Sequence, residues 1–389
     1  MSHRFGCNKS WLSAPLLALL GLPMGLKAQA GVVVEQVEKS SEAEAAGVRA
    51  GDNITGWSQG TAEGKFDSPF DWGDFEIEWL PRGNVTLRGL RDSQGQTWML
   101  PNGTPGITVR PVLREDLTPL WQRYREMEMA GKFAEAGEGW RGMIGQIGSS
   151  DPPWLAAWLQ FQLARALARA RQFAESDTAA QMAIDQATTT VANGAVTLLL
   201  AWGKLFTDRS DWARAEDCYQ RGLQVARKPS SPSLLEATSL HGLAIAFYRV
   251  GNLDGAGKSF ELELEIRRKL ASNSLDYAAT LNGLANVAHE RGTLERAVQY
   301  HRQALAIRQR LAPGSLDVAG SLNNLGNVEL DRGNLEQAAG YLEQALAIKQ
   351  KSAPGSLDLA ATLNVCRRIR SRVQAEYCHW AGDGPVRLR

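Results

Sequence analysis

Residues 274–314 read SLDYAATLNGLANVAHERGTLERAVQYHRQALAIRQRLAPG, and residues 315–355 read SLDVAGSLNNLGNVELDRGNLEQAAGYLEQALAIKQKSAPG. The two copies align without a gap at a period of 41 residues, and a third copy opens at Ser356 and matches as far as Asn364. A period of this length, with two helical patterns in each unit, predicts a solenoid in which each unit buries its apolar face against its neighbours. Function is therefore expected on an extended surface.

The sequence also marks where the helices of each unit begin and end. Pro313 and Gly314 break the chain, and Ser315 follows as a candidate N-cap. Asp317 then lies in the first helical turn, where the helix dipole favours a carboxylate. Gly292 lies between the two helical patterns of the first copy and is expected to end one helix and start the return.

The two copies resemble the tetratricopeptide repeat, in its long-unit, kinesin-light-chain-like subtype of roughly 40 residues. The positions that carry the resemblance are the small residue Gly326, the turn residue Gly333, and the second-helix alanines Ala338 and Ala345. The large aromatic residue of the family is kept earlier in the chain, at Tyr219 and Phe260, but is His301 and Leu342 in the two best copies. The resemblance implies a mostly α fold, a right-handed α-solenoid.

The same period extends toward the N-terminus. Counting back from Gly292 at spacings of 41, 41, 39 and 40 residues places the turns of the earlier units at Gly251, Ser210, Arg171 and Gly131. We expect the solenoid to span residues 114–373, with about six units from Leu117 to Pro354 and one further helix. Residues 374–389 would form a C-terminal tail.

Six tryptophans lie in the early units of the expected solenoid. Bulky aromatic side chains can fill wide helix interfaces, which predicts that these residues belong to the core. The alternative is a binding site for an aromatic ligand. The six are Trp121, Trp140, Trp154, Trp158, Trp202 and Trp212.

Residues 1–30 have the pattern of a signal peptide. Arg4 and Lys9 precede an apolar run, and Ala28-Gln29-Ala30 supplies small residues for cleavage. The sequence predicts an exported protein, periplasmic or secreted, whose mature chain starts near Gly31 and has no membrane segment. The formal net charge of +1 gives no indication of nucleic-acid binding.

Residues 31–113 predict a small β-rich domain. Expected strands cover Val32–Val37, Val85–Leu90, Gln96–Leu100 and Ile107–Val112, with a glycine-containing bend at residues 47–54. Ser68 followed by Pro69 predicts a helix that runs to about Leu80, because serine caps helices and proline suits the first helical position.

Within this region, the string from Val34 to Ile54 resembles a bacterial PDZ domain. It reads V-x-x-V-x-x-x-S-x-A-x-x-A-G-V-x-x-G-D-x-I. The resemblance implies a groove for an extended peptide beside the helix Pro69–Leu80. However, the family's groove strand and carboxylate-binding loop normally precede the first strand here, and little chain remains before it. Either residues 106–112 replace that strand, or the groove is absent and the domain is a spacer.

Asparagines recur on the first helices of the repeats and form the candidate binding surface. One row repeats at the 41-residue period, and a second row follows four residues later, so both share one helix face. Amide side chains donate and accept hydrogen bonds, so such rows suit the backbone of an extended peptide. The alternative is that the amides bond to neighbouring helices. The candidate residues are Asn282, Asn323 and Asn364 in one row, Asn286 and Asn327 in the other, and His241 one unit earlier.

Neither a catalytic motif nor a metal-ligand spacing is recognisable, so we expect no enzyme activity, metal or cofactor. The leading hypothesis is an exported scaffold that binds protein or peptide partners in the concave groove of the repeats. The order of signal, PDZ-like domain and long repeats also resembles the front portion of bacterial CHAT-domain proteins, which carry a caspase-like peptidase. The alternative is therefore a regulatory or truncated fragment of such a peptidase system.

The C-terminal end of the repeat pattern is abrupt. After Asn364 the 41-residue pattern stops and the composition turns to Arg, Val, Cys and Trp. We expect that no second helix covers the last helix of the repeat pattern. A frame change in the coding region would explain this abrupt end. The alternative is that the arginine-rich tail caps the last helix. Cys366 and Cys378 are candidates for a disulfide in an oxidising compartment.

Overall fold

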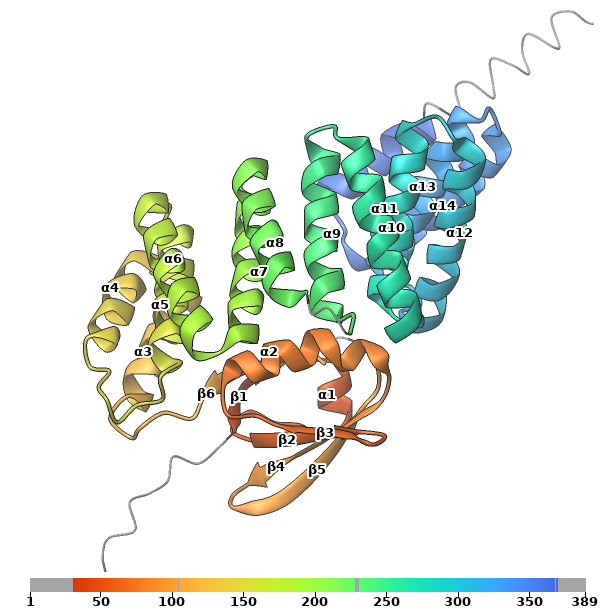
Figure 1. The fold of residues 1–389 in the computed structure, drawn as a ribbon. Coiled ribbons are helices and arrows are strands. Elements are labelled where there is room, and N and C mark those ends of the chain that lie inside the picture. Colours follow the sequence, from red (N-terminus) through yellow and green to blue (C-terminus); the bar gives the residue numbers. More distant parts are fainter. Residues whose placement is uncertain (1–30, 104, 228–230, 368, 370–389) are drawn as a thin grey trace, which may run out of the picture.

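A computed structural model describes residues 31–103, 105–227, 231–367 and 369. The expected signal peptide, the tail and Cys378 lie outside the described residues. A small antiparallel β domain precedes a solenoid of paired helices, as the sequence predicts (Figure 1). No helix in the described part of the chain is both long and apolar enough to span a membrane.

The β domain is one antiparallel sheet of six strands with a helix packed on it. The strand order is β5-β4-β2-β1-β6, and β3 pairs with β2. The strands are β1 (Val32–Val37), β2 (Asn53–Gln59), β3 (Ala62–Lys65), β4 (Val85–Arg91), β5 (Gln94–Leu100) and β6 (Ile107–Pro111). The sequence-based prediction did not include the β2–β3 hairpin. Strand β6 lies at the sheet edge beside β1, so residues 107–111 do supply a strand next to the first strand of the domain.

Three short helical elements complete the domain: α1 (Glu42–Ala45), α2 (Pro69–Glu78) and the 3-10 turn η1 (Leu80–Arg82). Helix α2 begins as the sequence predicts. Ser68 Oγ accepts from the backbone N–H of Asp71, and the Asp71 carboxylate accepts from the backbone N–H of Ser68 at 2.7 Å. This reciprocal capping satisfies two N–H groups that the first turn leaves unpaired.

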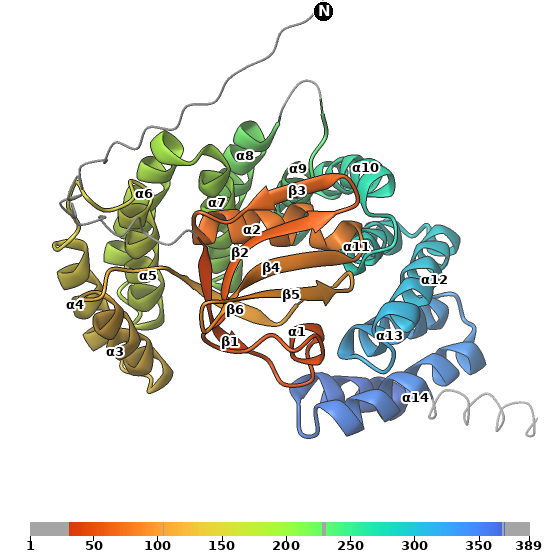
Figure 2. The ribbon, with the colours of Figure 1, turned by 90° about the horizontal axis from the view of Figure 1, so that it is seen from below.

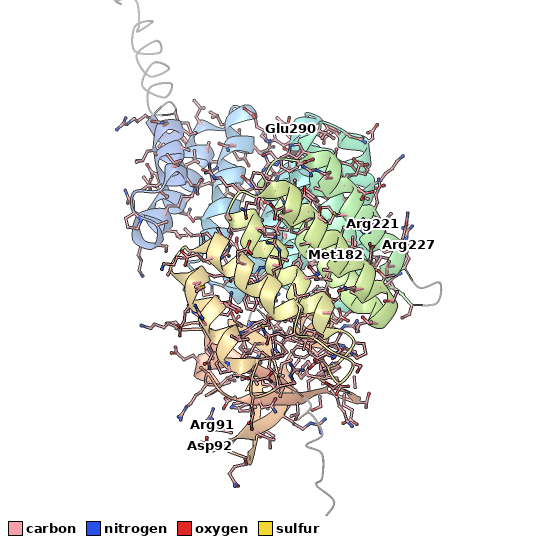
Figure 3. The ribbon with its side chains drawn as sticks, turned by 90° about the vertical axis from the view of Figure 1, so that its left-hand side faces the viewer. Arg91, Asp92, Met182, Arg221, Arg227 and Glu290 are labelled. Carbon is pink, nitrogen blue, oxygen red and sulfur yellow. The ribbon has the colours of Figure 1, made fainter. Side chains whose placement is uncertain are left out.

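The PDZ-like string contributes one buried ion pair to this domain. Asp52 is 1% exposed, and its carboxylate accepts from Arg91 Nε at 2.7 Å. It also accepts from the backbone N–H of Arg49, so it ties the bend at residues 47–54 to strand β4. Figure 3 shows Arg91 and its neighbour Asp92 on the β domain, far from Met182 and Arg221 of the solenoid.

The solenoid contains six consecutive helix pairs in the described residues, followed by a helical stretch at 357–367. The pairs are α3 (Thr118–Met129) with α4 (Phe133–Ile144), α5 (Leu155–Arg169) with α6 (Phe173–Thr190), α7 (Ala192–Asp208) with α8 (Trp212–Ala226), α9 (Leu234–Arg249) with α10 (Leu253–Leu270), α11 (Leu275–Glu290) with α12 (Leu294–Leu311), and α13 (Leu316–Asp331) with α14 (Leu335–Ser352).

The turn positions expected from the period all adopt the left-handed backbone conformation. Gly131, Gly251 and Gly292 have φ of 76°, 82° and 71°. Arg171 and Ser210 occupy the same place at φ of 63° and 59°, although side chains other than glycine seldom adopt this region. The turns therefore follow from the spacing of the repeat even where the residue type does not reveal them.

A cation recurs at the end of the second helix in the last three units, at residues 267, 308 and 349. Arg308 Nη1 donates to Ser321 Oγ at 2.7 Å, and Lys349 Nζ donates to Thr362 Oγ1 at 2.8 Å. Lys349 is 1% exposed and also pairs with Asp358. These contacts join each second helix to the first helix of the next unit.

Five of the six tryptophans belong to the helical core or pack against it. Trp121, Trp140 and Trp202 are buried, and Trp154 and Trp158 are partly buried against the same cluster. The rings of Trp121 and Trp140 meet edge to face, with centroids 4.9 Å apart. These contacts agree with the core-packing interpretation of the early units.

Candidate functional site

The first row of asparagines makes hydrogen bonds between helices. Asn282 Oδ1 accepts from Asn324 Nδ2 at 3.0 Å and lies 3.1 Å from His301 Nδ1. Burial lowers the pKa of His301 to about 3, so its ring is neutral and Nδ1 carries the proton that Asn282 accepts. Asn323 Oδ1 accepts from Thr362 Oγ1 at 3.1 Å. Both amides therefore link one unit to its neighbours.

The second row differs from the first. Asn286 on α11 and Asn327 on α13 are half-buried, and among the described residues neither amide makes a hydrogen bond. Asn364, in the final helical stretch, is exposed and likewise makes none with the described part of the chain. These three amides keep their donors and acceptors available.

His241 belongs to a buried polar network. Its Nδ1 lies 3.0 Å from Glu263 Oε2, and the fully buried Glu263 also accepts from Arg267 Nε and Thr280 Oγ1, each at 2.7 Å. Burial opposes protonation of His241, but the Glu263 carboxylate outweighs it and raises the pKa of the imidazole. The network joins α9, α10 and α11.

The structure also reveals a surface that sequence reasoning missed, the interface between the β domain and the solenoid. Helix α2 of the β domain lies against α7 and α9, as both ribbon views show (Figures 1 and 2). Thr197 Oγ1 on α7 donates to Asp74 Oδ1 on α2 at 2.8 Å. The helix that resembles the wall of a peptide groove is thus packed against the first helices of two repeat units.

Two glycines let these helices approach closely. A Cβ atom on Gly194 of α7 would lie 2.9 Å from the Phe70 ring of α2, and one on Gly73 would lie 2.9 Å from Thr197 Cγ2. Glycine is unfavourable inside a helix, so Gly73, in the middle of α2, was an available signal for a close contact.

Polar contacts fix the β domain at three further places. Glu78 accepts hydrogen bonds from the backbone N–H groups of Leu234 and Leu235 at 3.0 and 2.8 Å, so it caps α9. Asn102 Nδ2 donates to the carbonyl oxygen of Asn273, between α10 and α11, at 2.8 Å. The indole N–H of Trp121 on α3 donates to Glu35 on β1.

Several cavities lie along this interface, and Glu76 of α2 lines two of them. The first, of about 480 Å³, opens between the residues after β1 and the start of α11. Its charged lining is mostly acidic: Glu38, Lys39, Glu42, Glu76 and Asp276. The second, of about 260 Å³, lies between α2 and β6 on one side and α3, α5 and α7 on the other.

Burial raises the pKa of Glu76 to about 7, with a hydrogen bond from Trp72 acting in the opposite direction. This carboxyl group is therefore partly protonated near neutral pH.

The described residues contain no group of three or more His, Cys, Asp or Glu side chains arranged to hold a metal ion.

Comparisons with known proteins address the helical region. The tetratricopeptide repeat family model matches residues 235–310 and 276–351. A search of curated proteins finds no match.

Among solved structures, a signal transduction ATPase (STAND protein) with a tetratricopeptide repeat sensor, PH0952 from Pyrococcus horikoshii, is 13% identical, with a TM-score of 0.50. The match covers 67% of this chain and 41% of that chain, and it shows a shared fold. BtubC (BKLC) from P. vanneervenii is 24% identical over 62% of this chain and 96% of its own, with a TM-score of 0.42.

PilF from Pseudomonas aeruginosa is 16% identical over 63% of this chain and 96% of its own, with a TM-score of 0.42.

The family match falls on the units whose 41-residue period, turn conformations and helix pairs are described above. The similarity to tetratricopeptide repeats thus covers residues 235–351, within a longer solenoid of paired helices.

Proposed function

We propose that this protein is an exported, non-enzymatic scaffold that binds an extended segment of a protein or peptide partner along the first helices of its C-terminal repeats. The observation that carries the proposal is the pair of amides at Asn286 and Asn327. They lie one period apart on α11 and α13 and make no hydrogen bond with the described residues. Asn364 extends the surface onto the next helix.

In this proposal, one row of asparagines stabilises the repeat packing and the other row contacts the ligand. Asn282 and Asn323 hold successive helices in register through the hydrogen bonds described above. Asn286 and Asn327, one helical turn later, present amides that can pair with the N–H and C=O groups of an extended backbone. Such pairing is largely independent of the ligand's sequence, so neighbouring side chains would supply the selectivity.

The β domain limits where a partner binds. Helix α2 packs against α7 and α9, so the β domain occupies the first helices of these two units. We place the partner on α11, α13 and the final helical stretch. His241, buried toward Glu263 on α10, is assigned to the packing of the earlier unit.

The test starts from a peptide selected from a displayed library of C-terminally blocked peptides against the mature chain. Changing Asn286 and Asn327 together to Ala is expected to weaken its binding by at least about tenfold, since two amide contacts are lost. The matched control changes Gln303 and Gln344 to Ala, because these exposed amides also lie one period apart, on α12 and α14. Equal loss in both double variants would overturn the proposal.

Export has a separate test. Mass spectrometry of the mature protein is expected to find Gly31 at or near the N-terminus. An intact Met1 in the membrane fraction would contradict this assignment.

The alternative function, regulation of a caspase-like CHAT peptidase carried by another chain, draws support from the order of the modules. A neighbouring reading frame that encodes such a peptidase would favour it. Co-purification of that peptidase with this protein, and loss of the complex in the Asn286 and Asn327 double variant, would indicate that the peptidase is the partner bound at these asparagines.

A further inference from the structure

The 260 Å³ cavity between the β domain and the solenoid is lined by four charged side chains, and two of them form no ion pair with a described residue. Arg165 reaches it from α5, and Glu76 reaches it from α2. We propose that this cavity binds a small zwitterion, a free apolar amino acid or a short peptide, whose carboxylate pairs with Arg165 and whose ammonium group pairs with Glu76. The proposal is independent of the scaffold function on α11 and α13.

Arg165 is a cation without an ion-pair partner among the described residues. Its Nη1 donates to Gln162 Oε1 at 3.0 Å, and no carboxylate oxygen of the described chain lies within ion-pair distance. The nearby carboxylates Glu35 and Glu128 are paired with Arg125 instead. Burial lowers the pKa of Arg165, which is the effect of removing a guanidinium from water. A ligand carboxylate would restore the lost interactions in a two-pronged geometry.

Glu76 presents the complementary group. It forms no ion pair with any described residue, and it lines the cavity from the β domain. Its environment favours the neutral acid, as the raised pKa shows. Because Glu76 and Arg165 do not pair with each other, a ligand that carries both charges can pair with both side chains at once.

A third polar group is available beside them. The indole Nε1–H of Trp158 is buried and has no hydrogen-bond acceptor among the described residues. Trp158 lines the same cavity and packs edge to face on Phe70, with centroids 5.3 Å apart. An unpaired buried donor is costly, so a small rearrangement that let a ligand carboxylate accept this hydrogen bond would favour binding.

The remaining walls define the rest of the ligand. They are largely apolar: Phe70, Trp72, Ile107, Phe161 and Leu198. A volume of 260 Å³ lies below that of sites for drug-sized molecules, and it suits one amino acid with an apolar side chain or a small dipeptide. Both domains contribute walls, so a bound zwitterion would also stabilise the docked arrangement of the β domain.

Calorimetric titration of the mature protein tests the proposal with L-leucine, L-phenylalanine and the dipeptide Ala-Leu. N-acetyl-L-leucine and L-leucinamide, which each lack one charge, are the comparison probes. At least one zwitterion is expected to bind, with both single-charge analogues weaker by about tenfold or more. Comparison of the dipeptide with the amino acids identifies which source of the zwitterion the cavity accepts.

Substitutions test whether Arg165 and Glu76 bind the two charged groups of the ligand. Arg165→Gln and Glu76→Gln are each expected to weaken zwitterion binding by about tenfold or more. Arg169→Gln, an exposed arginine four residues later on the same helix, is the matched control and should bind normally. Arg165→Lys keeps the charge without the two-pronged geometry and should fall between native protein and Arg165→Gln. Melting curves without ligand establish that each variant is folded.

Proton release on ligand binding distinguishes direct pairing with Glu76 from a purely structural role of that residue. Binding of an ammonium group favours ionised Glu76, so near pH 6 the protein should release a proton on binding. The enthalpy would then depend on the buffer in the native protein but not in Glu76→Gln. No binding of any zwitterion at concentrations up to about 10 mM, or equal binding of the single-charge analogues, would overturn the proposal.

Discussion

The carboxylate of Glu78 accepts the backbone N–H of Leu235 at 2.8 Å, so a residue of the β domain caps a helix of the solenoid 157 residues later in the chain. Its other oxygen accepts the N–H of Leu234. A carboxylate at a helix N-terminus satisfies two otherwise unpaired donors and interacts favourably with the helix dipole. The two parts of the molecule are therefore joined through backbone groups as well as side chains.

Glu78→Ala is expected to lower the free energy of unfolding by about 1–2 kcal/mol, the usual effect of losing a helix cap. Hydrogen exchange at the amides of Leu234 and Leu235 should accelerate, because both donors lose their acceptor. The control is Glu63→Ala, a surface carboxylate with 71% side-chain exposure that pairs with Arg88. Unchanged exchange at α9 would show that this cap does not exist in solution.

Gly194→Ala tests the close approach of α2 and α7. The new methyl group would meet the Phe70 ring at 2.9 Å, so either the β domain shifts or the ring moves. We expect destabilisation of about 1–3 kcal/mol, as for other overpacked interfaces. Gly340→Ala on α14 is the matched control, because nothing lies within 4 Å of its added Cβ and alanine favours a helix. Thermal unfolding of both variants gives the comparison, and stabilisation of both would contradict the tight contact.

His301 should make the protein sensitive to acid. Its pKa is lowered by burial from 6.5 to about 3, so the unfolded chain binds a proton before the folded chain does. The stability that it contributes is present above pH 6.5 and is lost as the pH falls, by about 2 kcal/mol at pH 5.

His301→Leu introduces the residue that Leu342 supplies one period later. It should gain stability relative to the native protein as the pH drops from about 7 to 5, because the variant has no imidazole to protonate. Denaturant titrations at several pH values measure the difference. A difference that stays constant with pH would mean that His301 is not buried as described.

The β domain is expected to bind peptides, if at all, without a requirement for a free C-terminal carboxylate. The cavity next to Asn102 and Gly103 is lined by several carboxylates and a single lysine, an unfavourable setting for another anion. Fluorescence anisotropy with one peptide in its free-acid and amidated forms provides the measurement. Tighter binding of the free acid would refute this expectation.

Much of the fold could be predicted because its determinants are local or periodic. The repeat spacing of 39 to 41 residues placed the turns correctly even at Arg171 and Ser210, which lack glycine, since each unit repeats the same packing. Ser68 and Pro69 similarly marked the start of α2, whose capping contacts lie within one helical turn. The hairpin β2–β3 was missed because its glycines obscure the alternation of apolar and polar residues that identifies a strand.

The asparagine rows show the limit of periodicity for the candidate site. The period placed the asparagines on one helix face, but both rows have the same residue type at the same spacing. Only the positions of Asn324 and Thr362 on neighbouring helices distinguish the amides that bond within the protein from those that remain available. The sequence therefore determined where candidates lie, and packing determined what each can still bind.

By itself, the sequence determined the paired helices, their turns, the small β domain that precedes them and the helix face that carries the amides, because these depend on neighbours in the chain or on a repeated unit. The tertiary structure alone decided that the β domain docks on α7 and α9. That contact depends on side chains such as Asp74 and Thr197, 123 residues apart and linked by no shared pattern. It likewise decided that Arg165 and Glu76 share one cavity, since burial and the absence of an ion pair arise only when separate surfaces meet.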